Sequence, residues 1–201
     1  MSDVIRVGVN GAGGRMGRRI VALTHADPAL EVTAAVDAEA SGLVGQDVGE
    51  LAGIGAIGVA VSTTLAENVD VVIDFSTPKG LSDIATACHE RSIALVAATT
   101  GLEPEQQTVV DSVAEVAGLI VAPNMSLAVN ILFALTRQVA KMLDDDFDIE
   151  IVEMHHRHKM DAPSGTALGL GRAAAAGRGV SLDDAGVQSR EGQTGARDRG
   201  A

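Results

Sequence analysis

The sequence predicts an α/β protein whose first part is a parallel sheet covered by helices on both faces. Short apolar runs and helical patterns alternate along residues 1–126. The apolar runs show no polar alternation, which is typical of strands buried on both sides. Val, Ala, Ile and Leu must build the core, because the 201 residues include three Phe and no Trp or Tyr.

Each predicted element rests on a local pattern: strands are continuous apolar runs, and helices are amphipathic segments between turns. The predicted strands are Ile5–Asn10, Val32–Asp37, Val59–Ser62, Val69–Phe75, Ile93–Ala98 and Leu119–Ala122. The predicted helices are Arg15–His25, Leu81–Arg91 and Pro104–Ala117, and Ser41–Gly58 is interpreted as a Gly-rich loop.

The alternation of strand and helix patterns ends near residue 124, so we divide the chain into domains 1–126 and 127–201. The second domain begins with the longest helical pattern, Leu127–Leu143. A strand, Ile149–Met154, should follow the break at Asp144–Asp146, so this domain is expected to be part of an α+β unit. The helix carries one apolar stripe, formed by Leu127, Ile131, Leu135, Val139 and Met142.

Bulk properties exclude several classes of protein. The net charge of −12 argues against nucleic acid or an anionic membrane as partner. No apolar run approaches the ~18 residues of a membrane span, and no signal peptide is evident. The single cysteine, Cys88, excludes an intramolecular disulfide framework and is expected to be buried. A soluble, cytoplasmic protein is the expectation.

A glycine-rich turn joins the first strand to the first helix. Glycines there permit a tight turn and close approach of a pyrophosphate, and the helix N-terminus adds N–H donors. The spacing fits G-x-x-G-x-x-G, and Asp37 ends the second strand about twenty residues later. We therefore predict a Rossmann-like dinucleotide site, with a plain strand–helix turn as the alternative. The turn reads Gly11-Ala12-Gly13-Gly14-Arg15-Met16-Gly17.

Asp37 bears on the choice of cofactor. Its carboxylate would accept hydrogen bonds from an adenosine ribose and would repel a 2′-phosphate. The next residue, Ala38, offers no cation, although Arg15 could help. The cofactor is thus NADH or NADPH, with NADH favoured. An ordinary role for Asp37 at a strand end stays open.

Three polar triplets fall at predicted strand ends, where ligands bind in doubly wound sheets. Their hydroxyls and amides are candidates for contacts near the nicotinamide, and each triplet alone could be a plain turn. They are Phe75-Ser76-Thr77, Thr99-Thr100-Gly101 and Asn124-Met125-Ser126.

The segment after the predicted strand Ile149–Met154 concentrates acid–base groups and positive charge, in His155, His156, Arg157, His158 and Lys159. Alternate residues of a strand share a face, so His155 should lie with Glu153 while His156 points the other way. Lys159 could curl back toward His155.

A Pro-Ser-Gly-Thr turn follows, with Ser164 as a plausible N-cap of the next helix. The N–H groups of Gly165 and Thr166 would then be available to a carboxylate. With Lys159 they predict a site for a small dicarboxylate. A solvated basic loop is the alternative, and a metal site of His155, His156 and His158 matches no standard zinc spacing.

Several motifs together resemble the bacterial dihydrodipicolinate (4-hydroxy-tetrahydrodipicolinate) reductase family, in order from Ile5 to about Gly195. They are G-A-G-G-R-M-G, V-V-I-D-F-S, A-T-T-G, A-P-N-M-S-L-A-V-N and E-M-H-H-R-H-K-M-D-A-P-S-G-T-A-L. The resemblance implies NAD(P)H-dependent reduction of a cyclic dicarboxylate in lysine and diaminopimelate biosynthesis, by a homotetramer. Residues 127–201 would then belong to a substrate-binding and oligomerisation domain.

The resemblance also implies residue roles. His155 would be the general acid–base group and Lys159 its cationic partner, and His156, Lys159, Ser164, Gly165 and Thr166 would hold the substrate. The implied cofactor-binding residues are Gly11 to Met16, Asp37, Ala98, Thr99, Thr100, Pro123, Asn124, Met125 and Ser126.

The chain departs from the family pattern in two places. Ala38 stands where family members often carry Arg, which weakens the case for NADPH. After Ser189–Gly195 the sequence reads A-R-D-R-G-A and stops, whereas chains of the family continue well beyond this point. We therefore expect a C-terminally shortened reductase. The alternatives are an inactive nucleotide-binding fragment and another amino-acid or imino-acid oxidoreductase with the same first domain.

Overall fold

The computed structural model describes residues 4–144, 146–157, 159, 162–189 and 191–196. The chain divides into two compact units, Met1–Ala122 and Pro123–Ala201. None of the described helices is long and apolar enough to cross a membrane.

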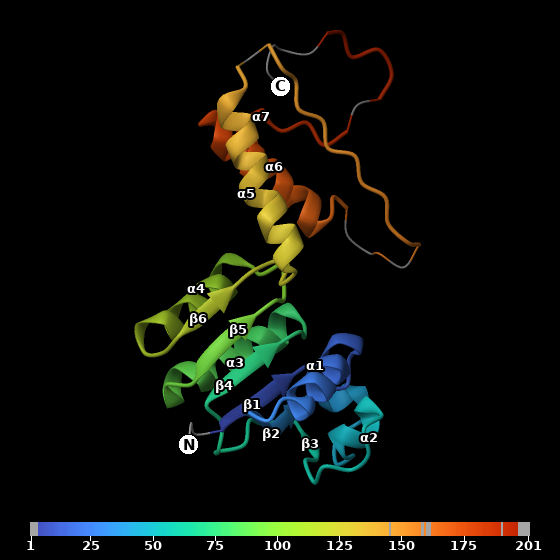
Figure 1. Cartoon of the computed structure of the whole chain (residues 1–201), viewed down its shortest axis with the longest axis vertical. Coiled ribbons are helices and arrows are strands. Elements are labelled where there is room, and N and C mark those ends of the chain that lie inside the picture. The colour runs from blue at the N-terminus through green and yellow to red at the C-terminus, as the bar shows by residue number, and fades with distance from the viewer. Residues whose placement is uncertain (1–3, 145, 158, 160–161, 190, 197–201) are drawn as a thin grey trace. The chain divides into compact units, whose positions relative to one another are not determined.

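The first unit is built on a six-stranded parallel sheet in the order β3-β2-β1-β4-β5-β6 (Figure 1). Strand order runs outward in both directions from the β1–β4 pair, so this pair marks the topological switch point where doubly wound folds bind ligands. The predicted Rossmann-like α/β fold is confirmed. The strands are β1 (Ile5–Asn10), β2 (Leu30–Val36), β3 (Val61–Ser62), β4 (Val71–Asp74), β5 (Ala94–Ala97) and β6 (Leu119–Val121).

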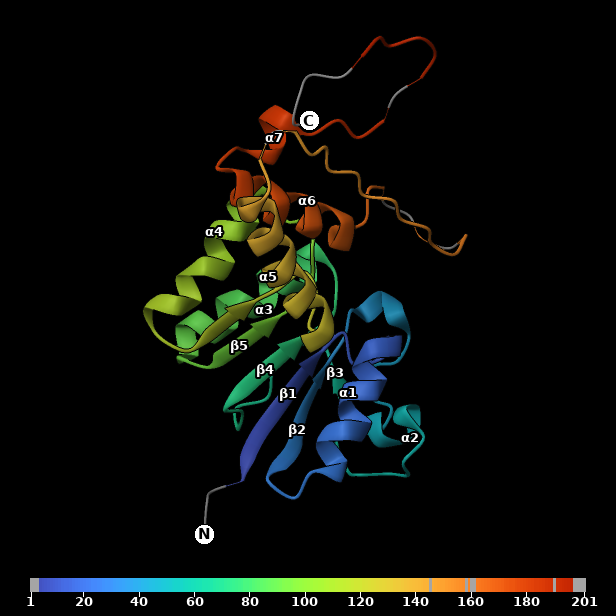
Figure 2. The ribbon, with the colours of Figure 1, turned by 45° about the horizontal axis from the view of Figure 1, so that its top comes forward.

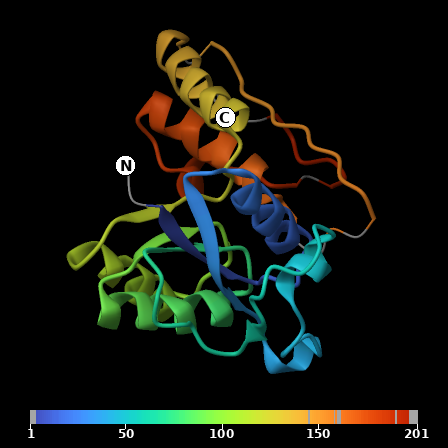
Figure 3. The ribbon, with the colours of Figure 1, turned by 60° about the horizontal axis from the view of Figure 1, so that its bottom comes forward.

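Helices cover both faces of this sheet, and each face has its own apolar core. One core joins the sheet to α1 and α2 through residues such as Val9, Val21 and Val48. The other joins it to α3 and α4 through residues such as Leu81 and Val110. Figures 2 and 3 show α1 and α3 on opposite sides of the strands. The helices are α1 (Arg15–Ala26), α2 (Val48–Ala52), α3 (Pro78–Arg91) and α4 (Pro104–Ser112), with 3-10 turns at Glu39–Ser41 and Val113–Glu115.

Cys88 belongs to the core beneath α3 and is fully buried, as predicted. Burial raises the pKa of its thiol to about 12. Because the thiolate is the reactive form, this cysteine has a packing role and is not a nucleophile.

The predicted loop Ser41–Gly58 was wrong in part, since it contains the short helix α2. Asp47 caps this helix by accepting the N–H groups of Gly49 and Glu50, and Gly53 ends it in the left-handed region. The Asp47 carboxylate also accepts the N–H groups of Ile57 and Gly58, so it closes the whole loop. Desolvation opposes ionisation, yet these backbone donors lower the pKa of Asp47.

The second unit contains α5 (Leu127–Met142), α6 (Gly165–Arg178) and the short α7 (Leu182–Ala185). α5 and α6 lie side by side because glycines of α6 admit side chains of α5. A β-carbon at Gly169 would lie 2.6 Å from the Phe133 ring, and one at Gly177 would lie 2.8 Å from the Ala140 β-carbon. The apolar stripe predicted on α5 is exposed in the structure: Leu127, Ile131, Leu135, Val139 and Met142 are 50–83% exposed.

The predicted strand Ile149–Met154 was wrong as a paired element. These residues run as an extended chain (orange in Figure 1), and within the described part of the second unit no segment pairs with them. A strand is defined by its ladder of hydrogen bonds, so an apolar, strand-like sequence without a partner stays irregular.

Candidate functional site

The carboxyl ends of the central strands meet at one level of the sheet. Asn10 at the end of β1 is in register with Asp74 at the end of β4, and Asp74 is in register with Ala97 of β5. The polar segments after these strands are therefore brought to the same edge, where a parallel sheet of this kind binds its ligand.

The glycine-rich turn is shaped by two close backbone approaches. Gly11 has φ +75°, and a β-carbon there would lie 2.4 Å from the Phe75 carbonyl oxygen. A β-carbon at Gly17 would lie 2.1 Å from the Gly11 carbonyl oxygen. Gly14 is the N-cap of α1 and provides no capping side chain. The start of this 12-residue helix is thus open to an external acceptor, as a pyrophosphate requires.

Asp37 is joined to this turn directly. Its Oδ2 accepts the Gly13 N–H at 2.7 Å, and its Oδ1 accepts the Ala38 N–H at 2.8 Å. The carboxylate that is expected to contact the ribose therefore also holds the glycine-rich turn against the end of β2.

A pocket of about 610 Å³ opens beside these residues in the first unit. It brings together predicted groups from the glycine turn, Asp37 and the Phe75–Thr77 triplet. Thr63, Thr64 and Lys79 also line it, although sequence reasoning did not select them. The predicted cofactor residues in its lining are Gly11, Gly14 and Asp37, with Ser76 and Thr77 of the strand-end triplet.

Other predicted cofactor residues lie outside the lining of this pocket. Ala12 is buried in the core beneath the turn, and Met16 is exposed on α1. Gly13 donates to Asp37 instead of facing the cavity. The remaining ones outside this lining are Arg15, Ala98, Thr99, Thr100, Pro123, Asn124, Met125 and Ser126.

A buried carboxylate, Asp74, organises the edge and was missed from the sequence. Its Oδ1 accepts from Asn10 Nδ2 at 2.7 Å and Ser76 Oγ at 2.5 Å, and its Oδ2 accepts from Thr99 Oγ1 at 2.5 Å. The hydroxyl hydrogens of Ser76 and Thr99 thus point toward the buried carboxylate, and the Ser76 N–H donates to Thr99 Oγ1 at 3.1 Å, so the two strand ends are tied together. A polar residue closing the apolar run V-V-I-D was the available signal.

In the second unit, His155 lies against Glu153, as the alternation of side chains predicted. His155 Nδ1 is 2.6 Å from Glu153 Oε2, and the two side chains are 39% and 28% exposed. Glu153 Oε1 accepts the backbone N–H of Ser164 at 2.7 Å. One carboxylate therefore contacts both the histidine segment and the turn that opens α6.

The chain turns back after this pair. The His156 carbonyl oxygen accepts the Lys159 N–H at 3.1 Å. The Lys159 charge is near enough to contribute to the lowered pKa of Glu153, which is caused first by the hydrogen bonds from Ser164, against desolvation, and then by the charges of His155 and Lys159. Glu153, His155 and Lys159 thus form one charged cluster.

Ser164 caps α6 as predicted. Its Oγ accepts the Ala167 N–H at 3.0 Å, and the residue is 3% exposed. An α-helix has no internal acceptor for its first N–H groups, here those of Gly165 and Thr166. The Thr166 hydroxyl accepts from Asn124 Nδ2 at 3.2 Å, so a predicted cofactor residue contacts a predicted substrate residue.

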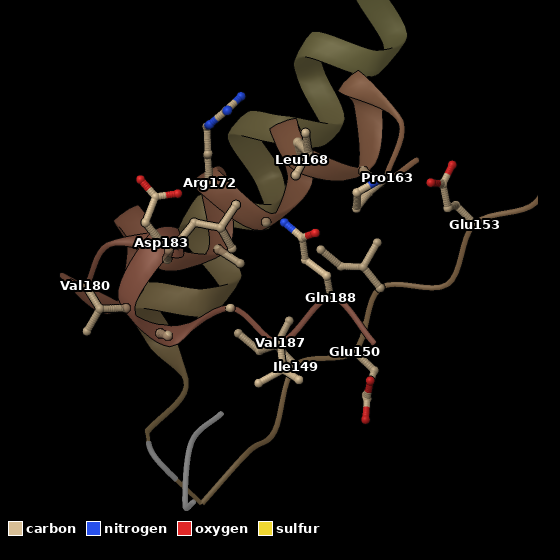
Figure 4. Close-up of a pocket in the computed structure, with 18 of the residues that line it drawn as sticks. Ile149, Glu150, Glu153, Pro163, Leu168, Arg172, Val180, Asp183, Val187 and Gln188 are labelled. Atoms are coloured by element: carbon tan, nitrogen blue, oxygen red, sulfur yellow. The ribbon is translucent and has the colours of Figure 1, made fainter. Parts of the chain in front are cut away.

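A second pocket, of about 780 Å³, is lined by α6, the extended segment 149–153 and residues 186–189 (Figure 4). Glu153 and Pro163 stand at its edge, where α6 begins. Of the predicted substrate residues, His155, His156, Lys159, Ser164, Gly165 and Thr166 are not part of its lining.

Among the residues with a described position, no three His, Cys, Asp or Glu side chains come together as a metal site. His158, which the alternative zinc site would require, lies outside the described residues.

Comparisons with known proteins identify the family of the chain. Residues 5–125 match the family described as dihydrodipicolinate reductase, N-terminus, and residues 128–200 match its C-terminus. The 4-hydroxy-tetrahydrodipicolinate reductase of Afipia carboxidovorans is 50% identical over the whole chain, and that of Parvibaculum lavamentivorans is 46% identical. The chain spans 74% and 75% of these relatives.

The solved structure of a dipicolinate-bound dihydrodipicolinate reductase from Paenisporosarcina sp. TG-14 is also similar. It shares 28% identity with a TM-score of 0.63, over 97% of this chain and 71% of that one. The N-terminal and C-terminal family models thus match the chain in order, and the chain belongs to the dihydrodipicolinate reductase family of NAD(P)H-dependent oxidoreductases.

Proposed function

We propose that this chain reduces 4-hydroxy-tetrahydrodipicolinate to tetrahydrodipicolinate with NADH, with His155 as the general acid–base group. The observation that supports this most directly is the double contact of Glu153. By bonding both His155 and Ser164, this carboxylate keeps an imidazole beside the start of α6. A proton donor and an anion-binding helix end then serve one small ligand.

The dicarboxylate substrate would be held by the start of α6 and the cationic turn before it. The N–H groups of Gly165 and Thr166 lie at the N-terminus of a 14-residue helix. This end of the helix dipole is positive and favours binding of a carboxylate. Lys159 would offset the negative charge that develops during reduction. The proposed substrate-binding residues are His156, Lys159, Ser164, Gly165 and Thr166.

The cofactor would be bound by the glycine turn and strand ends of the first unit. The open N-terminus of α1 would take the pyrophosphate, and Asp37 would accept from the ribose hydroxyls. When bound, a reduced nicotinamide supplies the hydride. The proposed cofactor residues are Gly11, Ala12, Gly13, Gly14, Arg15, Met16, Asp37, Ala98, Thr99, Thr100, Pro123, Asn124, Met125 and Ser126.

The pocket's charges favour NADH over NADPH. Asp37 and Asp83 place two carboxylates along its lining, and Lys79 pairs with Asp83 at 2.6 Å. Ala38 adds no cation. A 2′-phosphate would thus meet more negative than positive charge, whereas a ribose hydroxyl can donate to Asp37.

Loss of water from the 4-hydroxy compound would give the conjugated ring that accepts the hydride, and His155 would then deliver a proton to the ring carbon that becomes basic. An imidazole suits this step because its ordinary pKa is about 6.5, so both protonation states are accessible near neutrality.

The test is NADH oxidation at 340 nm, with substrate made in situ from pyruvate and aspartate semialdehyde by the preceding synthase. His155→Gln should lower kcat by about 10²- to 10⁴-fold, because a general acid contributes that much, while NADH binding is kept. His25→Gln, at the exposed end of α1, is the matched control. If His155→Gln retained turnover, the proposal that His155 is the general acid–base group would be wrong.

Two further outcomes of this assay are informative. NADH binding without turnover in the unaltered chain would favour a nucleotide-binding protein without catalysis. Light scattering of the same sample tests the homotetramer that the family resemblance implies.

A further inference from the structure

We infer that Glu153 is a positioning residue for the reaction: it fixes the orientation and tautomer of His155 and couples the imidazole to the substrate-binding end of α6. This inference rests on the proposed role of His155. It concerns a residue that neither touches the reacting atoms nor belongs to the proposed substrate contacts.

The first argument is the identity of the atoms in contact. Glu153 Oε2 lies 2.6 Å from His155 Nδ1, within the range of a charge-assisted hydrogen bond. An ionised carboxylate can only accept, so Nδ1 must carry the hydrogen. In the neutral imidazole, Nε2 is then the bare nitrogen. In the imidazolium, Nε2 carries the proton that can be given away, and Glu153 stabilises this charged form.

The second argument is that the same carboxylate has a second fixed partner. Glu153 Oε1 accepts the Ser164 N–H at 2.7 Å, across eleven residues of chain. Ser164 is buried and caps α6 through its hydroxyl. Because each oxygen is held by a different group, rotation of the carboxylate would break one contact or the other. The position of His155 is therefore fixed relative to the start of α6, because the carboxylate that it contacts is itself held in place.

The third argument is charge. The Ser164 hydrogen bonds lower the pKa of Glu153 against the effect of desolvation, and the charges of His155 and Lys159 act in the same direction. The carboxylate of Glu153 is therefore ionised near neutral pH. Figure 4 shows the Glu153 side chain next to Pro163, at the point where the turn enters α6.

The kinetic test separates the two contacts of Glu153. Glu153→Gln keeps an oxygen for the Ser164 N–H but presents an amide donor or a neutral oxygen to Nδ1. We expect kcat to fall roughly tenfold or more, short of the ~10²- to 10⁴-fold loss for His155→Gln, with KM nearly unchanged. Glu153→Ala removes both contacts, so KM should rise as well. Glu153→Asp shortens the side chain while retaining the charge and should recover part of kcat.

A double-mutant cycle tests whether Glu153 acts through His155. If it does, adding Glu153→Gln to His155→Gln should change kcat little further, because the contact is already gone. Multiplicative losses would show that Glu153 affects turnover by another route and would overturn the inference. Unchanged kcat in Glu153→Gln would overturn it too.

A measurement without turnover decides the point independently. Long-range ¹H–¹⁵N NMR of the chain's five histidines reports which ring nitrogen of each carries hydrogen, and His155→Gln identifies the His155 signals. In alkaline buffer, where imidazoles are neutral, the Nδ1–H tautomer of His155 should dominate in the unaltered chain and lose that dominance in Glu153→Gln. An unchanged tautomer would overturn the inference, whereas turnover retained by His155→Gln would overturn only the proposed acid role.

Discussion

The Thr99 hydroxyl lies 2.5 Å from the Asp74 carboxylate and ties the end of β5 to the end of β4. The same hydroxyl accepts the Ser76 N–H at 3.1 Å, and Asn10 donates to Asp74 from the end of β1. A carboxylate with no exposed surface is tolerated only when donors surround it. These side chains therefore form one network that sets the shape of the ligand-binding edge.

Thr99→Val should show what this network contributes. The substitution keeps the shape of the side chain but removes a donor to Asp74 and an acceptor for Ser76. We expect the free energy of unfolding to fall by about 1–3 kcal/mol, the cost of leaving buried polar groups short of a partner, together with weaker NADH binding. Urea unfolding followed by far-UV circular dichroism measures the first, since the chain has no Trp or Tyr.

The control for this substitution is Thr108→Val. The Thr108 hydroxyl donates to the Pro104 carbonyl oxygen on an exposed turn of α4, so its loss should stay within about 0.5 kcal/mol. Thr99→Ser should restore most of the stability. Equal effects of Thr99→Val and Thr108→Val would contradict the network.

A pair of glycine substitutions tests the packing of the cofactor turn. At Gly17 an added β-carbon would lie 2.1 Å from the Gly11 carbonyl oxygen and 2.7 Å from the Ala12 Cα, both backbone atoms that must move. Gly17→Ala should destabilise the chain by about 1–3 kcal/mol, as overpacking does, and weaken NADH binding. Gly14→Ala meets that oxygen at 3.2 Å with φ −70°, so its stability should change far less. Similar unfolding midpoints would refute the distinction.

Ala38→Arg tests the proposed basis of cofactor preference. A guanidinium beside Asp37 would meet a 2′-phosphate, and a charged hydrogen bond of this kind contributes about 1.5–3 kcal/mol. The ratio of the NADPH to the NADH dissociation constant should therefore fall by roughly tenfold or more, and the effect should weaken in high salt. Ala38→Gln, with length but no charge, serves as the comparison. An unchanged ratio would place the 2′ position elsewhere.

The ion pair of Arg6 and Asp70 predicts a pH-dependent stability. Hydrogen bonds from the Arg6 side chain and backbone lower the pKa of Asp70 to about 2, below its ordinary value of about 3.9. A lowered folded-state pKa stabilises the fold above the ordinary value, and this stabilisation is lost as the pH falls from about 4 to 2. Asp70→Asn should thus lower the melting temperature at pH 5 but make little difference near pH 2. Arg6→Gln already removes the partner of Asp70. Adding Asp70→Asn to Arg6→Gln should therefore cause little further pH-dependent change in the melting temperature.

The fold of the first unit could be predicted because its strands are continuous apolar runs and its turns are marked by Gly and Pro. α2 escaped because five residues within a Gly-rich segment show no helical period, and only the Asp47 cap defines its start. The apolar stripe of α5 is visible in the sequence, and its residues are exposed in the structure. The surface by which α5 packs on α6 could not be predicted, because it depends on two glycines of α6 that admit Phe133 and Ala140.

The candidate site was predictable where chemistry follows from local spacing. Glu153 and His155 are two residues apart in an extended segment, and Ser164 caps the next helix. The contact between Glu153 and Ser164 was not predictable, since no local rule connects residues eleven positions apart. Asp74 closes an apolar run, which is a local signal, but its contacts with Asn10 and Thr99 could not be predicted, because these residues come from two other strand ends.

Asp37 has one more consequence, for how cofactor use can evolve. The carboxylate that would bind the ribose also accepts the Gly13 N–H. A change at Asp37 would therefore alter both ribose binding and the conformation of the glycine-rich turn. A lineage adapting to the phosphorylated nucleotide would first accumulate changes at neighbouring positions, and a mutational library selected for that trait should be depleted of variants at position 37.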